Sequence, residues 1–117
     1  MAGFVLLLGL TGREPGPAHR VYFPADYDAE FDAIFGRRPV PVADPTVYVH
    51  APDDPALRPD ENSEGWFVLV NAPLHAPGRG VDWDAPGLAE RYRDRVLGVL
   101  AARGTDVRDR LRFAEVL

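Results

Sequence analysis

The segment Trp66-Phe67-Val68-Leu69-Val70 decides the fold, because it is apolar at every position. Side chains alternate between the two faces of a strand, so Trp66, Val68 and Val70 lie on one face. Phe67 and Leu69 point to the other face. Helices on a single side can bury only one of these faces, so we predict that the second face is an interface or a ligand-binding wall.

Four more strands are expected, three before this segment and one after it. Their apolar or alternating runs end at Pro and Gly residues, which are poorly tolerated inside a strand. We predict them at Phe4–Leu8, His19–Phe23 and Thr46–His50, with a closing strand from Arg110 towards Leu117. The first run is apolar throughout, as expected for a strand that is covered on both faces.

Two helices are predicted. The first is capped by Asp26 and ended by Gly36, and its apolar residues share one stripe. The second starts at Asp84, with Pro86 just inside it, and stops at Gly104. The stripes consist of Tyr27, Phe31, Ile34 and Phe35 in the first helix, and of Leu88, Tyr92, Val96, Val99 and Leu100 in the second.

The order of these elements predicts the fold class. From residue 19 onward it reads strand, helix, strand, strand, helix, strand, which is typical of ferredoxin-like folds. We therefore predict an α+β fold: a ferredoxin-like split βαβ sheet with an extra N-terminal strand and both helices on one face. At 117 residues the chain has the length of one domain, covering residues 1–117.

Composition excludes several classes of function. The net charge is −5 and no Lys/Arg stripe is present, which argues against a nucleic-acid partner, because such binding depends on neutralising phosphates. The chain has no cysteine, so it has no disulfide, thiolate nucleophile or iron–sulfur cluster. The apolar start is much shorter than the roughly 20 residues of a membrane-spanning helix, so we interpret it as a buried strand.

Motifs for catalysis are also missing. Gly78-Arg79-Gly80 opens no helix and is not a dinucleotide fingerprint. The carboxylate pair Asp53 and Asp54 lies in a Pro-rich loop, where a solvated turn is expected. The three histidines, which are His19, His50 and His75, are scattered, so hydrogen-bonded side chains at strand ends and in loops are expected in place of a metal site. We assign no catalytic, cofactor-binding or metal-binding residue.

The aromatic residues of the strands allow two interpretations. Core packing is the default for each one taken alone. Taken together, a sheet that is apolar on both faces and has few polar groups suits a long neutral hydrocarbon, which is held by shape and desolvation. From their strand positions, we predict a substrate-binding wall formed by Tyr22, Tyr48, His50, Trp66 and Val68.

Specific residues along the chain match a known pattern. They comprise residues 4–10, Ala18-His19, Tyr22-Phe23, Asp26-Tyr27, Glu30-Phe31, Ile34-Phe35, residues 44–46, Tyr48-Val49, Ala51-Pro52, residues 54–57, residues 67–70, Ala72-Pro73, residues 81–83 and residues 92–97. In order and spacing, these fragments resemble the central region of phytoene desaturases and related carotenoid dehydrogenases and isomerases. Arg20 stands where that family often has a second histidine, which leaves the carotenoid substrate open.

The resemblance implies that the parent protein is an FAD-dependent oxidoreductase of the phytoene dehydrogenase type, which removes hydride and a proton from a long polyene. It implies that this chain is a substrate-side fragment, whose sheet borders a hydrophobic tunnel beneath the flavin ring. The chain lacks a dinucleotide-binding unit, so we expect no FAD bound to it and no catalysis by it alone. The expected partners are a carotenoid polyene and the missing FAD-binding domain, in a cytoplasmic protein that contacts membranes peripherally.

An alternative interpretation is a stand-alone ferredoxin-like module. Such a module would form a homodimer through its exposed sheet face or bind a small apolar ligand there. Both interpretations predict self-association, so that observation alone does not separate them. An upstream in-frame segment encoding a strand, a GxGxxG motif and a helix would favour the desaturase.

Overall fold

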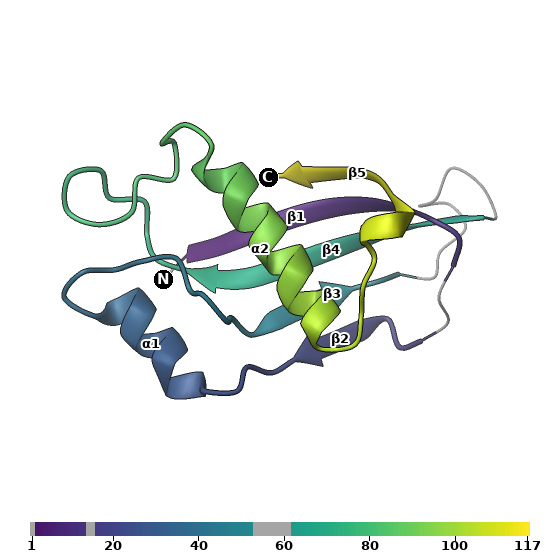
Figure 1. Ribbon diagram of the computed structural model, residues 1–117, viewed down its shortest axis with the longest axis horizontal. Helices are drawn as coiled ribbons and strands as arrows, with labels where there is room; N and C mark the ends of the chain where they lie inside the picture. Colours follow the sequence, from purple (N-terminus) through teal and green to yellow (C-terminus); the bar gives the residue numbers. More distant parts are fainter. Residues whose placement is uncertain (1, 14–15, 53–61) are drawn as a thin grey trace.

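One antiparallel sheet organises the protein. The computed structural model describes residues 2–13, 16–52 and 62–117. Its strands are β1 (Ala2–Thr11), β2 (His19–Tyr22), β3 (Val47–His50), β4 (Ser63–Ala72) and β5 (Leu111–Val116). Its helices are α1 (Tyr27–Phe35), α2 (Leu88–Ala102) and a short 3-10 helix (Arg108–Arg110) that leads into β5. Figure 1 shows α2 lying across the strands.

The strand order is β2-β3-β4-β1-β5, and every neighbouring pair is antiparallel. The α+β class is therefore confirmed. The ferredoxin-like split is not confirmed, because β2 and β3, which flank α1, are direct antiparallel neighbours. The N-terminal strand lies in the interior of the sheet and is not an addition at its edge: β1 pairs with β4 along ten residues, from Ala2 opposite Ala72 to Thr11 opposite Ser63. Its apolar composition on both faces favours this interior position.

The core lies between the sheet and α2. The side chains that alternate towards α2 are buried, and Trp66, Val68 and Val70 share this face as predicted. From β1 and β3 the core takes Phe4, Leu6, Leu8, Leu10, Val47 and Val49, and from α2 it takes Tyr92, Val96, Leu97 and Leu100. Three aromatic rings meet at one end, where Phe4 packs edge-on against Tyr92 with ring centroids 4.9 Å apart and also contacts Trp83.

Helix α1 has the predicted ends but not the predicted packing. Asp26 caps it by accepting a hydrogen bond from the Ala29 N–H at 3.2 Å, and Gly36 follows its last residue. In Figure 1 the helix lies beside the strands instead of across them. Of the predicted stripe only Ile34 is buried, whereas the other three side chains are exposed: Tyr27, Phe31 and Phe35. These rings contact one another along the helix surface.

The buried polar residue of α1 is Glu30, which is 2% exposed. Its carboxylate accepts hydrogen bonds from the backbone N–H and the hydroxyl of Thr46, at 2.5 and 3.1 Å. Thr46 is itself fully buried and directly precedes β3. Burial raises the pKa of the neighbouring Tyr92, and the charge of Glu30 adds to this effect. Tyr92 donates its hydroxyl hydrogen to the Val42 carbonyl at 2.9 Å.

Helix α2 starts later than the sequence predicts. Asp84 and Pro86 lie in turns, and the helix begins at Leu88 after Gly87, which has φ of 79° and provides no side-chain cap. Asp84 instead donates its backbone N–H to the Asp82 carboxylate at 3.0 Å. An Asx-type turn therefore replaces the predicted helix cap. At the other end, Gly104 with φ of 96° follows the helix as predicted.

Arg103, directly after α2, connects three segments. Its guanidinium donates to the Tyr22 carbonyl at 2.8 Å and to the Asp44 carboxylate. Asp44 also accepts from the Ala25 N–H at 3.2 Å. Burial would raise the pKa of Asp44, but the hydrogen bonds from Arg103 and Ala25, together with the guanidinium charge, lower it below 3.8. The lowered pKa means that the folded state favours the charged carboxylate.

We expect Asp44→Asn to destabilise the protein only where Asp44 is ionised. A lowered folded-state pKa contributes stability that is present above the unfolded-state pKa and is lost as pH falls through the folded-state value. Because Asp44 is half-exposed, we expect a loss of about 0.5 kcal/mol near neutral pH, which disappears as the pH falls through the lowered folded-state pKa. Urea unfolding of both proteins across this range measures it. An equal loss at every pH would show that the Asp44 charge is not involved.

Candidate functional site

The helix-free side of the sheet is apolar, as predicted from Phe67 and Leu69. We call this surface the open face. Its apolar residues are Val5 and Leu7 from β1, Val21 from β2, Tyr48 from β3, Phe67 and Leu69 from β4, and Phe113 from β5. The same face also carries polar side chains, namely His19, His50, Asn71 and Glu115. Phe67 is 46% exposed and Leu69 is 41% exposed, although both lie in the interior of β4. Within the described residues, no helix packs on them.

A groove of about 410 Å³ runs over β2, β3 and β4 on the open face. Its lining comprises His19, Arg20, Val21, Tyr48, Val49, His50, Phe67 and Leu69. Strand pairing arranges the outward side chains in two rows. Val21, Tyr48 and Leu69 form the first row across the three strands, and His19, His50 and Phe67 form the second. The groove therefore has an apolar row at one end and a histidine pair at the other.

The two histidines of the second row stack on each other. Their ring centroids are 4.5 Å apart and the ring planes differ by 2°. His50 also lies near the Phe67 ring, at 6.4 Å between centroids. In the described part of the chain, neither imidazole takes part in a hydrogen bond. Their nitrogens are the polar side-chain atoms of the second row. Arg20 also lines the groove, but its guanidinium lies over the ring of Trp66, which belongs to the covered face.

The structure divides the predicted substrate wall between the two faces. Tyr48 and His50 come together in the groove of the open face. Trp66 and Val68 are fully buried on the opposite face, beneath α2. Tyr22 also points to that face, where its hydroxyl accepts a hydrogen bond from the Thr105 hydroxyl at 2.9 Å.

Six groove residues were not on the predicted wall, among them His19, Phe67 and Leu69. The signal for the last two was present in the strict alternation of β4, because the residues between Trp66, Val68 and Val70 must face away from them. His19 could not be placed from the sequence, because its neighbour depends on the register of β2 against β3. Side-chain direction was therefore predictable, and cross-strand pairing was not.

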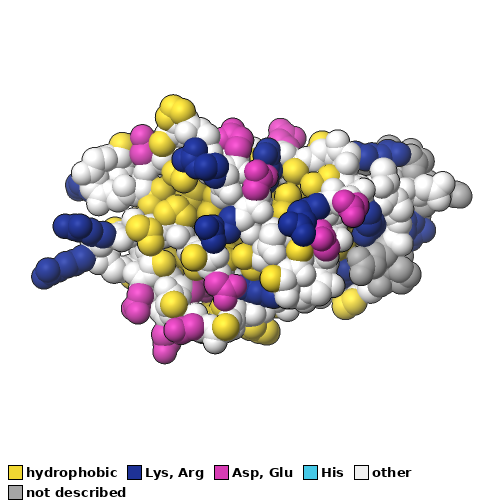
Figure 2. Space-filling model, viewed as in Figure 1, with side chains coloured by type: hydrophobic (Ala, Val, Ile, Leu, Met, Phe, Trp, Pro, Cys, Tyr) yellow, Lys and Arg dark blue, Asp and Glu magenta, His cyan; other side chains and the backbone are white. Residues whose placement is uncertain are grey.

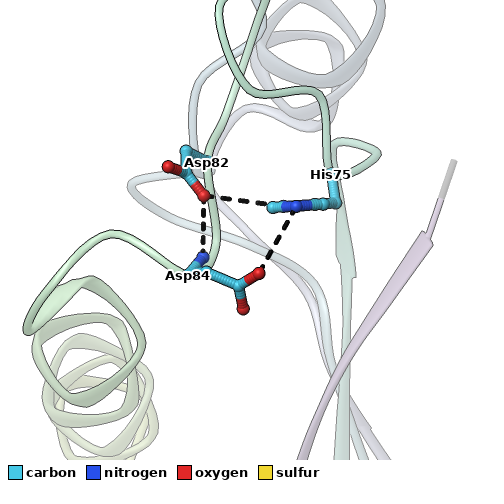
Figure 3. Close-up of side chains that lie close together, drawn as sticks. All are labelled: His75, Asp82 and Asp84. Atoms are coloured by element: carbon cyan, nitrogen blue, oxygen red, sulfur yellow. Dashed lines mark hydrogen bonds and ion pairs between the residues drawn. The ribbon is translucent and has the colours of Figure 1, made fainter.

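A second cluster, in the loop between β4 and α2, contains His75, Asp82 and Asp84 (Figure 3). Its potential ligand atoms lie within 4.8 Å of one another. His75 Nδ1 accepts a hydrogen bond from the Trp83 N–H at 3.1 Å, so a neutral ring carries its hydrogen on Nε2. Nε2 faces the Asp84 carboxylate at 3.5 Å. Neither nitrogen then offers a free lone pair, so this arrangement stabilises the loop and does not favour a cation.

A larger groove of about 670 Å³ lies between α2 and the segment before β3. Charged side chains take part in its lining, including Arg91, Arg95 and Asp44. Figure 2 shows this side of the molecule, where basic and acidic groups are interspersed with apolar patches. A neutral hydrocarbon would have to desolvate these charges, so the open-face groove is the better candidate for such a ligand.

The carboxylate pair Asp53 and Asp54, predicted to form a solvated turn, lies outside the described residues. The same is true of the family-like fragment at residues 54–57. Among the helices that the structure describes, none has the length and apolar character needed to cross a bilayer.

Fold and groove together define an α+β segment with one sheet face covered by a helix and one apolar face open. No protein-family profile matches the chain. The chain is 36% identical over 114 residues to the carotenoid 3,4-desaturase of Haloarcula japonica. This alignment covers 94% of the chain and 21% of the relative. It is 34% identical over 88 residues to the phytoene desaturase of Neurospora crassa, covering 73% of this chain and 14% of the relative.

A third relative is the 1-hydroxycarotenoid 3,4-desaturase of a Flavobacterium species, which is 39% identical over 57 residues. This alignment covers 47% of the chain and 11% of the relative. The chain is thus related to carotenoid and phytoene desaturases along nearly all of its own length, which confirms the resemblance to that family. It spans about a fifth or less of the length of these curated relatives.

Proposed function

We propose that this chain is the substrate-side domain of an FAD-dependent carotenoid desaturase, and that its open face forms one wall of a hydrophobic tunnel for the polyene. The observation that carries the proposal is the apolar groove over β2, β3 and β4, in a chain related to carotenoid desaturases. The tunnel is completed by other parts of the larger protein.

The chemistry of the groove supports this role. A polyene hydrocarbon offers no hydrogen-bonding group, so its binding energy comes from burying apolar surface, at roughly 25 cal/mol per Å². Tyr48, Phe67 and Leu69 provide such surface on strands, which hold side chains at fixed spacing. Trp66 and Val68 support the same strands from the covered face, so we propose that they position the wall without contacting the substrate.

The glycine-containing turn Gly78-Arg79-Gly80 does not fit a phosphate site for FAD. In Gly78-Arg79-Gly80 the N–H groups of Arg79 and Gly80 both donate to the Ala76 carbonyl, at 3.1 and 2.8 Å. These donors close a turn and do not point towards an anion. We therefore propose that FAD binds to another part of the larger protein and that residues 1–117 have no activity alone. Because carotenoids partition into lipid, we also propose a cytoplasmic enzyme that contacts the membrane peripherally.

A homodimer through the open face is a second candidate. Phe67, Leu69 and Phe113 are each about half-exposed, and such apolar patches also mark protein interfaces. The two functions differ in the effect of ligand. A polyene that binds the open face should dissociate a dimer formed through it, whereas a dimer formed elsewhere should be unaffected. Sedimentation of the chain with and without a carotenoid separates these outcomes.

The proposed function is tested by replacing the matching segment of the Haloarcula relative with this chain. We expect the chimera to desaturate its carotenoid, and Phe67→Ser in the chimera to lower the rate at limiting substrate about tenfold, because part of the apolar wall is lost. Phe31→Ser is the matched control, since Phe31 is 44% exposed and lies on α1, away from the groove. Pigment extraction and absorbance spectra measure the conversion.

Two results would contradict the proposal. A folded, FAD-loaded chimera that converts no carotenoid would remove the assignment to carotenoid desaturation. Equal rates for Phe67→Ser and the unsubstituted chimera would show that the open face is not the wall, even if the enzyme class is right.

A further inference from the structure

The histidine end of the groove is chemically unlike the remainder of the open face. His19 and His50 are directly opposite in the β2–β3 pairing and stack within 4.5 Å. Both are exposed, and within the described residues neither imidazole makes a hydrogen bond. The adjoining row, Val21, Tyr48 and Leu69, is mainly apolar. The groove is therefore amphipathic along the strand direction.

A pure hydrocarbon that covered this end would remove water from the imidazole nitrogens and return no hydrogen bond. Buried polar groups without partners cost free energy, so such a ligand would bind less well than one with a matching polar group. A neutral imidazole has one N–H donor and one acceptor nitrogen. A hydroxyl is also both a donor and an acceptor, so it can satisfy either ring nitrogen or bridge the two rings.

We propose that the His19–His50 pair selects a polyene that carries a hydroxyl group near the end that reaches it. This inference rests on the proposed function, because it assumes that the groove binds a polyene. The apolar row binds the hydrocarbon part of the polyene, and the imidazole pair distinguishes a hydroxylated end from a hydrocarbon end. The pair acts in specificity and not in the removal of hydrogen.

The test uses the 117-residue chain with two probes that differ only in the hydroxyl: all-trans-retinol and its deoxy hydrocarbon, axerophthene. Fluorescence titration should show about tenfold tighter binding of retinol, the gain typical of one satisfied hydrogen bond. In His19→Phe/His50→Phe the ring stacking and apolar area are retained while the nitrogens are lost. We expect this variant to bind both probes equally, and to bind the hydrocarbon more tightly than the unsubstituted chain does, because no imidazole nitrogen is then desolvated.

His75→Phe is the matched control, because it makes the same change outside the groove and should keep the preference for retinol. If the double variant does not fold, as judged by circular dichroism, the single variants His19→Phe and His50→Phe carry the test and should each reduce the preference. Equal binding of both probes by the unsubstituted chain, or a preference that survives loss of both imidazoles, would overturn the inference and leave the apolar wall in place. Binding of neither probe would overturn the proposed function together with the inference.

Discussion

Trp66→Ala is expected to lower the free energy of unfolding by about 4 kcal/mol, the typical loss for a large aromatic side chain removed from a core. Trp66 is fully buried in β4, beneath α2 and beside the apolar residues of β1. Its removal leaves a cavity that strands paired on both sides cannot easily close. Urea unfolding followed by circular dichroism measures the loss.

Trp66→Phe should behave differently. The indole Nε1 is buried and has no hydrogen-bond partner in the described part of the chain. A buried donor without a partner costs about 1–3 kcal/mol, so its removal offsets much of the packing that the smaller ring loses. We expect a net change within about 1 kcal/mol. The indole also contacts the Arg20 guanidinium, 5.0 Å from its ring, and a phenyl ring retains part of that attraction.

Phe67→Ala is the matched control for Trp66→Ala. It changes the next residue of the same strand, which is 46% exposed on the open face. We expect a loss of about 1 kcal/mol, because about half of its surface is already exposed to solvent. A loss as large as that of Trp66→Ala would mean that the open face is buried in solution, by a second copy. A loss for Trp66→Phe as large as for Trp66→Ala would mean that Nε1 has a partner.

The contrast between Trp66 and Phe67 shows what the sequence can predict. Alternation within a strand is a local property, so the division of this segment between two faces could be read from five residues. Which face receives the helix depends on contacts between distant segments. The predicted wall accordingly combined residues from both faces: Tyr48 and His50 lie in the groove, whereas Trp66 and Val68 do not.

Helix α1 shows the limit of periodicity in another way. The predicted stripe is present, but Tyr27, Phe31 and Phe35 are exposed. Periodicity identifies an apolar face without identifying what packs against it, and in a protein a helix is buried only if tertiary contacts reach it. The residue that anchors α1 is instead Glu30, which looks like one more solvated acid among Asp28 and Asp32. Its partner, Thr46, is too distant in sequence for a local pattern to reveal.

The strand order could not be predicted for a related reason. Element order favours a ferredoxin-like split, in which a helix connects two strands that are not neighbours. Here the 24 residues between β2 and β3, with α1 among them, connect direct neighbours, and the strongly apolar strand β1 takes an interior position between β4 and β5. Burial of a two-faced apolar strand thus outweighed the order of the elements. The direct pairing of β2 with β3 also places His19 opposite His50 and so creates the histidine end of the groove.

Glu30→Ala is expected to lower the free energy of unfolding by about 3 kcal/mol, because it leaves two buried donors of Thr46 without partners. Glu30→Gln keeps an acceptor for the Thr46 N–H and should lose only about 1 kcal/mol. Asp32→Ala, on the same helix but exposed, is the control and should change stability by less than about 0.5 kcal/mol. Urea unfolding of the three variants gives these values.

The effect of Glu30→Ala should also reach the groove. Thr46 directly precedes β3, which carries Tyr48 and His50, so a loosened Thr46 frees the start of the strand that forms the centre of the groove. We expect amide hydrogen exchange at Val47–His50 to accelerate more than exchange in β1 and α2, and we expect weaker polyene binding. If Glu30→Ala loses stability uniformly and exchange in β3 rises no more than in β1, then the buried carboxylate supports the core as a whole. If it loses no stability, the Glu30–Thr46 contact does not anchor β3, and the position of the groove depends on strand pairing alone.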